Sequence, residues 1–211
     1  MPTRIPIPLG LLAGAFQVCM ASSLAAQQPL LRLDKDLRDE VKQRGALAWD
    51  RRRPLRWSDF RGAPPDTTQK EAAQTSSGFV YGLQCDDTYL EYGVLAVFQP
   101  DSSWVRPDVR TDSLQSFVLP HEQGHFDIAE IAARLFRRDL RELRVPCSSV
   151  KSTASRMVQA ADLRERALQQ RYDAETVHGT SAKKQAEWLE RIRTTLDSLS
   201  PMSAPVESRK Y

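Results

Sequence analysis

The sequence predicts an α+β fold, in which a small antiparallel sheet is followed by three helices. Two β-rich runs, residues 75–85 and 88–100, flank the pair Asp86 and Asp87, which is the pattern of an antiparallel hairpin. From Pro120 onward, apolar residues recur at helical spacing. At the start of this helical part lie two of the three histidines of the chain, four residues apart.

The N-terminus has the features of a secretory signal peptide. A basic residue, Arg4, precedes an interrupted apolar run that ends in small residues near Ala26. The run is shorter than the ~20 apolar residues that cross a bilayer. We therefore expect a signal peptide at residues 1–26, a secreted or periplasmic protein, and no stable membrane span after cleavage.

The remaining chain has the length of one domain. We expect an N-terminal helical segment at residues 27–48, the main domain at 49–199 and a disordered tail at 200–211. The 30 basic residues nearly balance the 27 acidic ones, so the net charge of +3 gives no reason to expect nucleic acid as a partner.

The cysteines favour one disulfide bond. Cys19 falls within the expected signal peptide, which leaves Cys85 and Cys147 in the mature chain. Export to an oxidising compartment favours a bond between them, and two buried free thiols are the alternative.

Local signals place the elements of the main domain. The run LRWSDFRGAPP at residues 55–65 is expected to form a short strand closed by a turn, and SSWV at 102–105 another short strand. Helices are expected at about 120–143, 152–171 and 181–199. A proline begins the first of these helices, at the position where its missing N–H costs least.

The stretch HEQGH, residues 121–125, has the spacing of a metal site on a helix. His121 and His125 project from one helical face, and Glu122 lies ~100° around the axis. In the HExxH pattern of zinc hydrolases, two imidazoles bind one Zn²⁺ and the glutamate takes a proton from its water. We therefore predict a zincin-like helix packed on the sheet, with Glu122 as the catalytic base. An ordinary polar helix start is the alternative.

A catalytic zinc ion needs a third protein ligand. No glycine occurs between Gly124 and Gly179, so the helix should continue and the ligand should come from a distant segment. The segment YDAETVHG, residues 172–179, contains the third histidine, and His178 is therefore our first choice of ligand. A helix end capped by Gly179, without any metal, is the alternative.

Three other residues of this segment are candidates for the site. Glu175 and then Asp173 follow His178 as alternative ligands, or as groups that orient a ligand. The hydroxyl of Tyr172 can donate a hydrogen bond to a developing oxyanion. A tyrosine at a helix end is also a common packing residue.

Several blocks of the chain resemble a family of bacterial predicted secreted zinc-dependent proteases, whose function is largely uncharacterised. They lie in this order between Trp49 and Trp188: WSDFRGAPP, AAQTSSGFVY, SSWV, HEQGHFDIAE, YDAETVHG and QAEW. The resemblance implies that YDAETVHG, and with it His178, belongs to the metal site. Pro120 departs from the family, where a helix former is expected. Because the family's protease label itself rests on HExxH, the resemblance implies a fold and a metal site more firmly than a substrate.

These observations lead to three hypotheses of function. The first is a secreted hydrolase with one Zn²⁺ bound by His121, His125 and His178, which cleaves a peptide or protein outside the cytoplasm with Glu122 as general base. The second is an amidase that acts on the peptide cross-links of peptidoglycan. The third is a non-catalytic envelope binding protein that zinc stabilises, which would require a closed site with four protein ligands.

Overall fold

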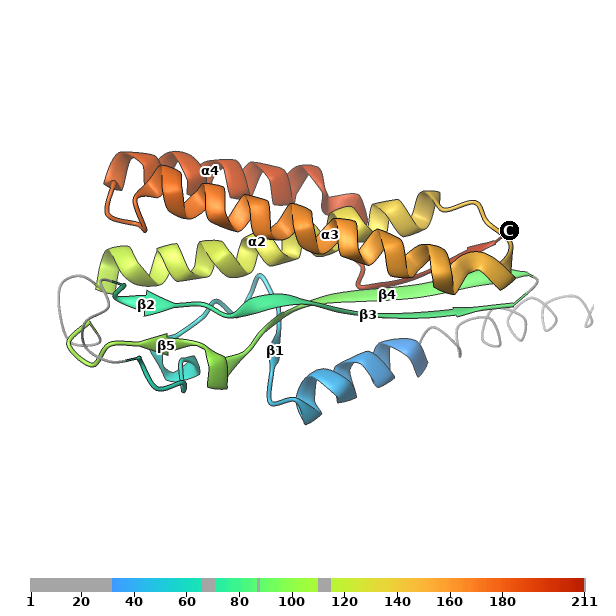
Figure 1. Ribbon diagram of the computed structural model, residues 1–211, viewed down its shortest axis with the longest axis horizontal. Coiled ribbons are helices and arrows are strands. Elements are labelled where there is room, and N and C mark those ends of the chain that lie inside the picture. The colour runs from blue at the N-terminus through green and yellow to red at the C-terminus, as the bar shows by residue number, and fades with distance from the viewer. Residues whose placement is uncertain (1–31, 66–70, 87, 110–114, 211) are drawn as a thin grey trace, which may run out of the picture.

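The computed structural model describes residues 32–65, 71–86, 88–109 and 115–210. Within this part of the chain, a helix, a sheet and a group of three long helices lie in layers (Figure 1). The expected α+β class is confirmed. The N-terminal helix covers residues 32–43, and the expected signal peptide lies outside the described residues. No helix of the described ranges combines the length and the apolar character that a bilayer crossing requires.

A long hairpin forms the centre of the main sheet. β3 (Ser77–Cys85) pairs along its length with β4 (Tyr89–Phe98), so the predicted hairpin is confirmed. β1 (Leu47–Ala48) and β6 (Val206–Lys210) pair with different parts of the other side of β4. β3 is therefore an edge strand of the sheet that the described residues form.

A second sheet has two short strands. β2 (Ala73–Gln74) pairs with β5 (Trp104–Val105), which confirms the strand expected in SSWV. The strand expected at residues 55–65 is wrong, because this segment contains the 3-10 helix η1 (Trp57–Asp59). The carboxylate of Asp59 accepts a hydrogen bond from the backbone N–H of Arg56 at 2.8 Å, which turns the chain locally.

The C-terminal tail is ordered, and our expectation of a disordered tail is wrong. After η3 (Ser200–Met202), β6 pairs with β4. The hydroxyl of Tyr92 donates to Glu207 at 2.7 Å, and the N–H of Val94 donates to the carbonyl of Pro205 at 2.9 Å. The polar tail has no apolar pattern of its own, and the backbone groups of the adjacent strand β4 supply its partners.

The three long helices differ from expectation mainly at their ends. α2 (Gln115–Glu142) begins before Pro120, so the proline lies inside the helix rather than at its start. α3 (Cys147–Thr176) is longer than expected at both ends. α4 (Ala182–Ser198) follows the expected range closely, with Ser181 at its N-cap position.

The core has three parts, and α2 contributes to two of them. Alternate residues of β4 pack toward α2 and α3, while Leu95 and Val97 pack on the N-terminal helix. On its other side, α2 packs Ile128 and Ile131 against Trp188 of α4. Because α2 lies between the sheet and α4, its polar residues near the middle of the helix are also enclosed.

One enclosed polar group is an ion-pair network. Glu130 accepts hydrogen bonds from Arg134 at 2.7 Å and from Arg137 at 3.1 Å. Arg137 also donates to the carbonyls of Val94 and Met202. Glu130 and Arg134 are four residues apart on one face of α2, and the pair is buried between α2, β4 and η3.

The predicted disulfide bond between Cys85 and Cys147 is confirmed. The two Cα atoms are 5.8 Å apart, and the bond joins the end of β3 to the first residue of α3. A disulfide fits a protein outside the reducing cytoplasm.

Candidate metal centre

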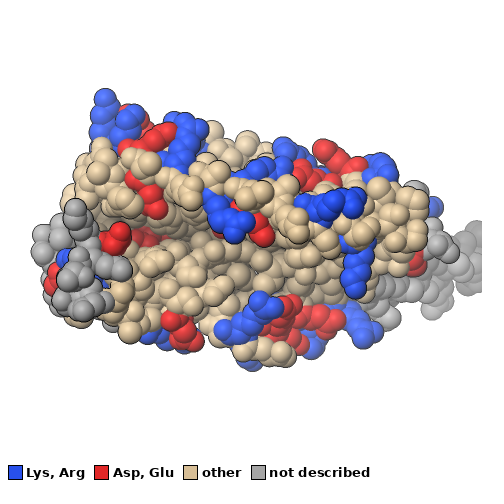
Figure 2. All heavy atoms as spheres, viewed as in Figure 1, with Lys and Arg blue, Asp and Glu red and all other residues tan. Residues whose placement is uncertain are grey.

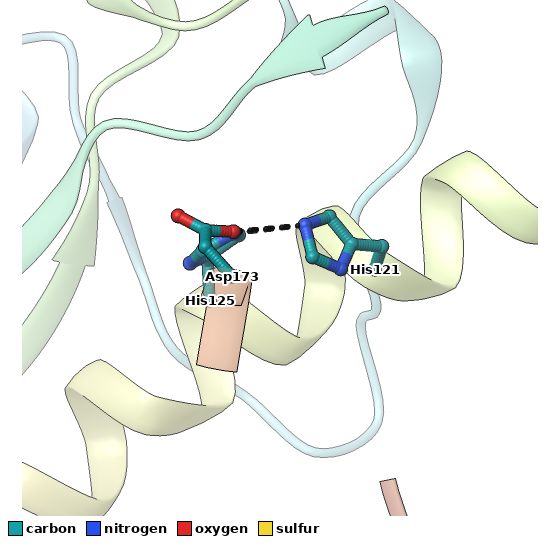
Figure 3. A group of neighbouring side chains, drawn as sticks. All are labelled: His121, His125 and Asp173. Carbon is teal, nitrogen blue, oxygen red and sulfur yellow. Dashed lines mark hydrogen bonds and ion pairs between the residues drawn. The ribbon is translucent and has the colours of Figure 1, made fainter. Parts of the chain in front are cut away.

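Two histidines of α2 and one aspartate of α3 converge on one point (Figure 3). The Nε2 atoms of His121 and His125 are 3.2 Å apart. Asp173 places its Oδ1 atom 3.2 Å from the first of these nitrogens and 3.0 Å from the second. Three potential metal-ligand atoms therefore lie in mutual contact.

These distances fit one small cation. Zinc bonds of ~2.0–2.2 Å to nitrogen and oxygen put tetrahedral ligand atoms ~3.3 Å apart. Burial by itself disfavours the charge of Asp173, but hydrogen bonds from His121 and His125 outweigh it and lower the pKa of this carboxyl far below its usual value. Asp173 therefore carries the charged form that binds metals.

Two glutamines fix the orientation of the histidine rings. Gln185 of α4 donates its amide to the hydroxyl of Tyr172 at 2.6 Å, so its oxygen faces Nδ1 of His121 at 3.0 Å. Gln169 of α3 donates its amide to the carbonyl of His125 at 3.0 Å, and its oxygen lies 2.6 Å from Nδ1 of the same residue. An amide oxygen can only accept, so each Nδ1 carries a proton and each Nε2 faces the centre. A bound metal ion would take the lone pair of each Nε2 in place of its hydrogen bond to Asp173. Sequence analysis missed both glutamines, which no short motif marks.

Glu122 lies beside the histidines in a buried position. Its side chain is 3% exposed, and its Oε2 atom has no hydrogen-bond partner among the described residues. Burial raises the pKa of its carboxyl, against the opposing effect of the nearby histidines. An unpaired buried carboxylate oxygen costs free energy, and a polar molecule bound at the centre would satisfy it.

Tyr172 supports the histidines from the side. It is fully buried, and its ring stacks on that of His121 with centroids 4.7 Å apart. Its hydroxyl donates to the carbonyl of His121 at 3.2 Å and accepts from Gln185. These two hydrogen bonds use the hydroxyl within the core, which disfavours the expected role of Tyr172 as an oxyanion donor.

Gly124 makes this packing possible. A Cβ atom at this position would lie 2.3 Å from the hydroxyl oxygen of Tyr172. The glycine of HEQGH thus lets α3 approach the helix that carries the histidines.

The helical phase of α3 places Asp173, rather than His178, with the two histidines. α3 continues to Thr176, so Gln169 and Asp173 lie one turn apart on the face toward α2. Glu175 faces away and accepts a hydrogen bond from Trp188 at 2.9 Å. Glu175 is therefore not among the residues that converge on the centre.

His178 lies in the turn that follows α3. Its side chain is 64% exposed, and its Nδ1 atom is 3.8 Å from Oδ1 of Asp173, so it borders the centre without joining it. Val177, His178 and Gly179 all have positive φ angles, of 54°, 52° and 77°. The left-handed conformation of Gly179 agrees with the alternative of a helix end capped by this glycine. Val177 in the same conformation is strained, and such strain is often found at functional sites.

The turn also holds His121 in place. A Cβ atom at Gly179 would lie 2.9 Å from Cγ of His121, so the backbone of the turn packs on the imidazole. The segment YDAETVHG thus lies at the candidate centre, with its aspartate, its tyrosine and its last glycine next to His121.

A groove of about 800 Å³ lies beside the centre. Ser77, Gly78 and Phe79 of β3 form one wall, and Glu165 and Gln169 of α3 form another. Figure 2 shows this face hollowed between the helices and the strands, with charged side chains along both rims. Gln169 connects the groove to the centre, because it lines the groove and also bonds His125, although the three potential metal ligands are not among the lining residues.

Comparisons with known proteins bear on this region of the chain. No curated protein and no solved structure matches the sequence. The matched family model begins within the 3-10 helix η2 (Pro100–Ser102) and ends in the turn after α3, so it contains His121, Glu122, His125 and Asp173. Residues 101–179 match a family described as a bacterial protein of unknown function (DUF922).

Proposed function

We propose that the protein is a single-zinc hydrolase in which His121, His125 and Asp173 bind the metal and Glu122 is the general base. The observation that carries the proposal is the convergence of three ligand atoms at 3.0–3.2 Å beside a buried carboxylate oxygen that has no hydrogen-bond partner among the described residues. Two imidazoles and one carboxylate are ligands that zinc prefers.

The number of ligands favours catalysis over a structural role. Structural zinc sites are closed by four protein ligands, whereas catalytic sites have three and an open position. The group found among the described residues has three members. This argues against the zinc-stabilised binding protein.

The residues divide the chemistry between them. Held by His121, His125 and Asp173, a zinc ion would supply Lewis acidity, which would polarise a carbonyl and lower the pKa of water toward ~7. Glu122 takes a proton as the water oxygen bonds to the carbonyl carbon, and it passes this proton to the nitrogen when the carbon–nitrogen bond breaks. Its burial favours the protonated form between these two steps. Gln169 and Gln185 keep the imidazoles in the orientation that binds metal.

The groove supports a polypeptide as substrate. β3 is an edge strand, and an extended peptide can add to such an edge through backbone hydrogen bonds. A Cβ atom at Gly78 would meet no other atom within 4 Å, so space is open above this strand. With the disulfide, this favours peptides or proteins outside the cytoplasm as substrates.

The substitution Glu122→Gln tests the mechanism. We expect the variant to retain one zinc ion and to lose hydrolysis of a labelled casein by ~100-fold or more, the usual effect of removing a general base. Metal content by mass spectrometry and initial rates on the same samples would check this. Glu142→Gln, an exposed change at the end of α2, is the matched control. Unchanged hydrolysis in the zinc-loaded Glu122→Gln protein would refute the assigned role.

A further inference from the structure

The wall of the groove contains a buried carboxylate that the proposed mechanism does not use. Glu165 of α3 is 8% exposed and lines the groove, as does Asp162 one turn earlier. Among the described residues, no lysine or arginine forms an ion pair with either of them. Within the described part of the chain, the hydrogen bond that Glu165 accepts is a long contact of 3.5 Å from the amide of Gln169.

Two other buried carboxylates of the described residues pair with arginine, whereas Glu91 and Glu122, like Glu165, form no ion pair there. Asp59 pairs with Arg53 at 2.7 Å, and Glu130 pairs with two arginines of its own helix. Glu91 accepts from the amide of Gln84. Since burial of an unpaired charge is costly, Glu165 is a place where a cation from outside the chain would be stabilised.

The other charges of the groove do not cancel this preference. Arg44 and Arg166 also line it, but both are exposed, and Arg44 is paired with Glu40. The charged side chain that the groove encloses is therefore an acid. Burial raises the pKa of Glu165 to about 7, and the hydrogen bond from Gln169 and the charge of exposed Arg166 only partly oppose this shift.

We infer that Glu165 determines specificity by receiving the lysine or arginine side chain of an extended peptide that lies along β3. The inference rests on the proposed function. Gln169, one helical turn after Glu165, holds His125, so the cationic side chain would lie ~5–6 Å along α3 from the centre. At ~3.3 Å per residue, this is about two residues from the bond to be cleaved.

Binding of peptides tests the inference without hydrolysis. The probes are short fluorescent peptides that differ only in a central lysine, norleucine or glutamate, and the protein is the zinc-loaded mature chain carrying Glu122→Gln. Fluorescence anisotropy should show the lysine peptide binding about tenfold more tightly than the norleucine peptide. Adding Glu165→Gln should abolish this difference, and adding Glu165→Lys should favour the glutamate peptide.

Further variants distinguish an effect of the charge of Glu165 from an effect of a disturbed fold. Adding Glu142→Gln, on the exposed surface, should leave the preference for lysine unchanged. Adding Gly78→Leu should weaken binding of the lysine and norleucine peptides alike, because the new side chain projects into the groove. Zinc content and circular dichroism of each variant report whether the centre and the fold persist. If Glu165→Gln fails to fold, Asp162→Asn serves in its place, with a smaller loss of the preference expected.

The outcomes distinguish this inference from the proposed function. Equal binding of the lysine and norleucine peptides, no binding of any peptide, or a preference that survives Glu165→Gln would overturn the inference alone. A protein that hydrolyses casein but shows no preference for the lysine peptide would likewise overturn the inference and leave the proposed function standing. A preference that depends on Glu165 in a protein without any hydrolysis would uphold the inference and overturn the proposed catalysis.

Discussion

Asp173 illustrates how one residue gains its role from the phase of a helix. Each residue turns ~100° about the helical axis, so Asp173 and Gln169 share a face while Glu175 points away. Ligand chemistry alone favoured His178, because imidazole is a common zinc ligand. The continuation of α3 to Thr176 places that histidine beyond the helix and leaves it largely exposed.

The third ligand can be tested by metal content. We expect Asp173→Ala to reduce zinc affinity by ~100-fold or more, since it removes one of three ligands. His178→Ala should bind zinc as the wild type does. Competition with a fluorescent chelator would measure both, with Glu175→Ala as a control that faces away from the centre. Loss of zinc in His178→Ala with retention in Asp173→Ala would reverse the assignment.

Glu165 should make the stability of the protein depend on pH. Its pKa is raised from 4.5 to about 7 in the folded state by burial, so the folded state binds more protons than the unfolded state in this range. Stability contributed by the protonated carboxyl is therefore present below about pH 4.5 and is lost as the pH rises to about 7, by at most about 3 kcal/mol. The free energy of unfolding in urea at pH 5 and pH 8 would measure this loss. Glu165→Gln should lack it, and an equal loss in both proteins would contradict the prediction.

At the scale of elements, the contact between α2 and α3 builds the centre. α2 contributes both histidines, α3 contributes Asp173, and the ring of Tyr172 fills the space above Gly124. The centre therefore depends on how closely the two helices approach one another.

Gly124→Ala should push these helices apart. The added Cβ would lie 2.3 Å from the hydroxyl oxygen of Tyr172, which is buried and cannot swing aside. We expect a loss of ~1–3 kcal/mol in the free energy of unfolding and weaker zinc binding. Urea denaturation would measure the first. Gly78→Ala is the matched control, since its Cβ would meet nothing within 4 Å. Equal stability of the two variants would contradict this account.

At the scale of the whole molecule, bonds distant in sequence hold the layers together. The disulfide joins the hairpin to α3, and β6 joins the tail to β4. Both attachments lie at the hairpin end of β3 and β4, because Leu90 pairs with Cys85 on one side and with Arg209 on the other. Asp173 of the metal centre lies near the opposite end of α3 from Cys147.

Breaking the disulfide should destabilise the fold. The bond closes a loop of 62 residues, for which loop entropy gives a stabilisation of about 4 kcal/mol as an upper value. We expect the variant with Cys85→Ser and Cys147→Ser to unfold at lower urea concentration than the oxidised wild type. Adding a reductant should lower the stability of the wild type and leave the variant unchanged. A reductant effect of equal size on both would show that the disulfide is not the cause.

The sequence by itself determined the features that depend on local spacing. Alternation and turn residues gave the hairpin of β3 and β4, and apolar periodicity gave the three long helices to within a few residues at the ends of α4. The separation of four residues put His121 and His125 on one face of a helix. Export to an oxidising compartment favoured a disulfide bond between Cys85 and the other cysteine of the expected mature chain, Cys147.

The tertiary structure alone decided which faces meet. Asp173 rather than His178 approaches the histidines, two glutamines orient their rings, and the hydroxyl of Tyr172 is used within the core. The pairing of the C-terminal tail with β4 was likewise decided only by the tertiary structure. Periodicity fixes the direction of a side chain relative to its own helix or strand, but contacts also depend on where each element ends and how two elements pack. An error of one residue in that position turns a helical side chain by ~100°, enough to exchange a ligand for an exposed residue.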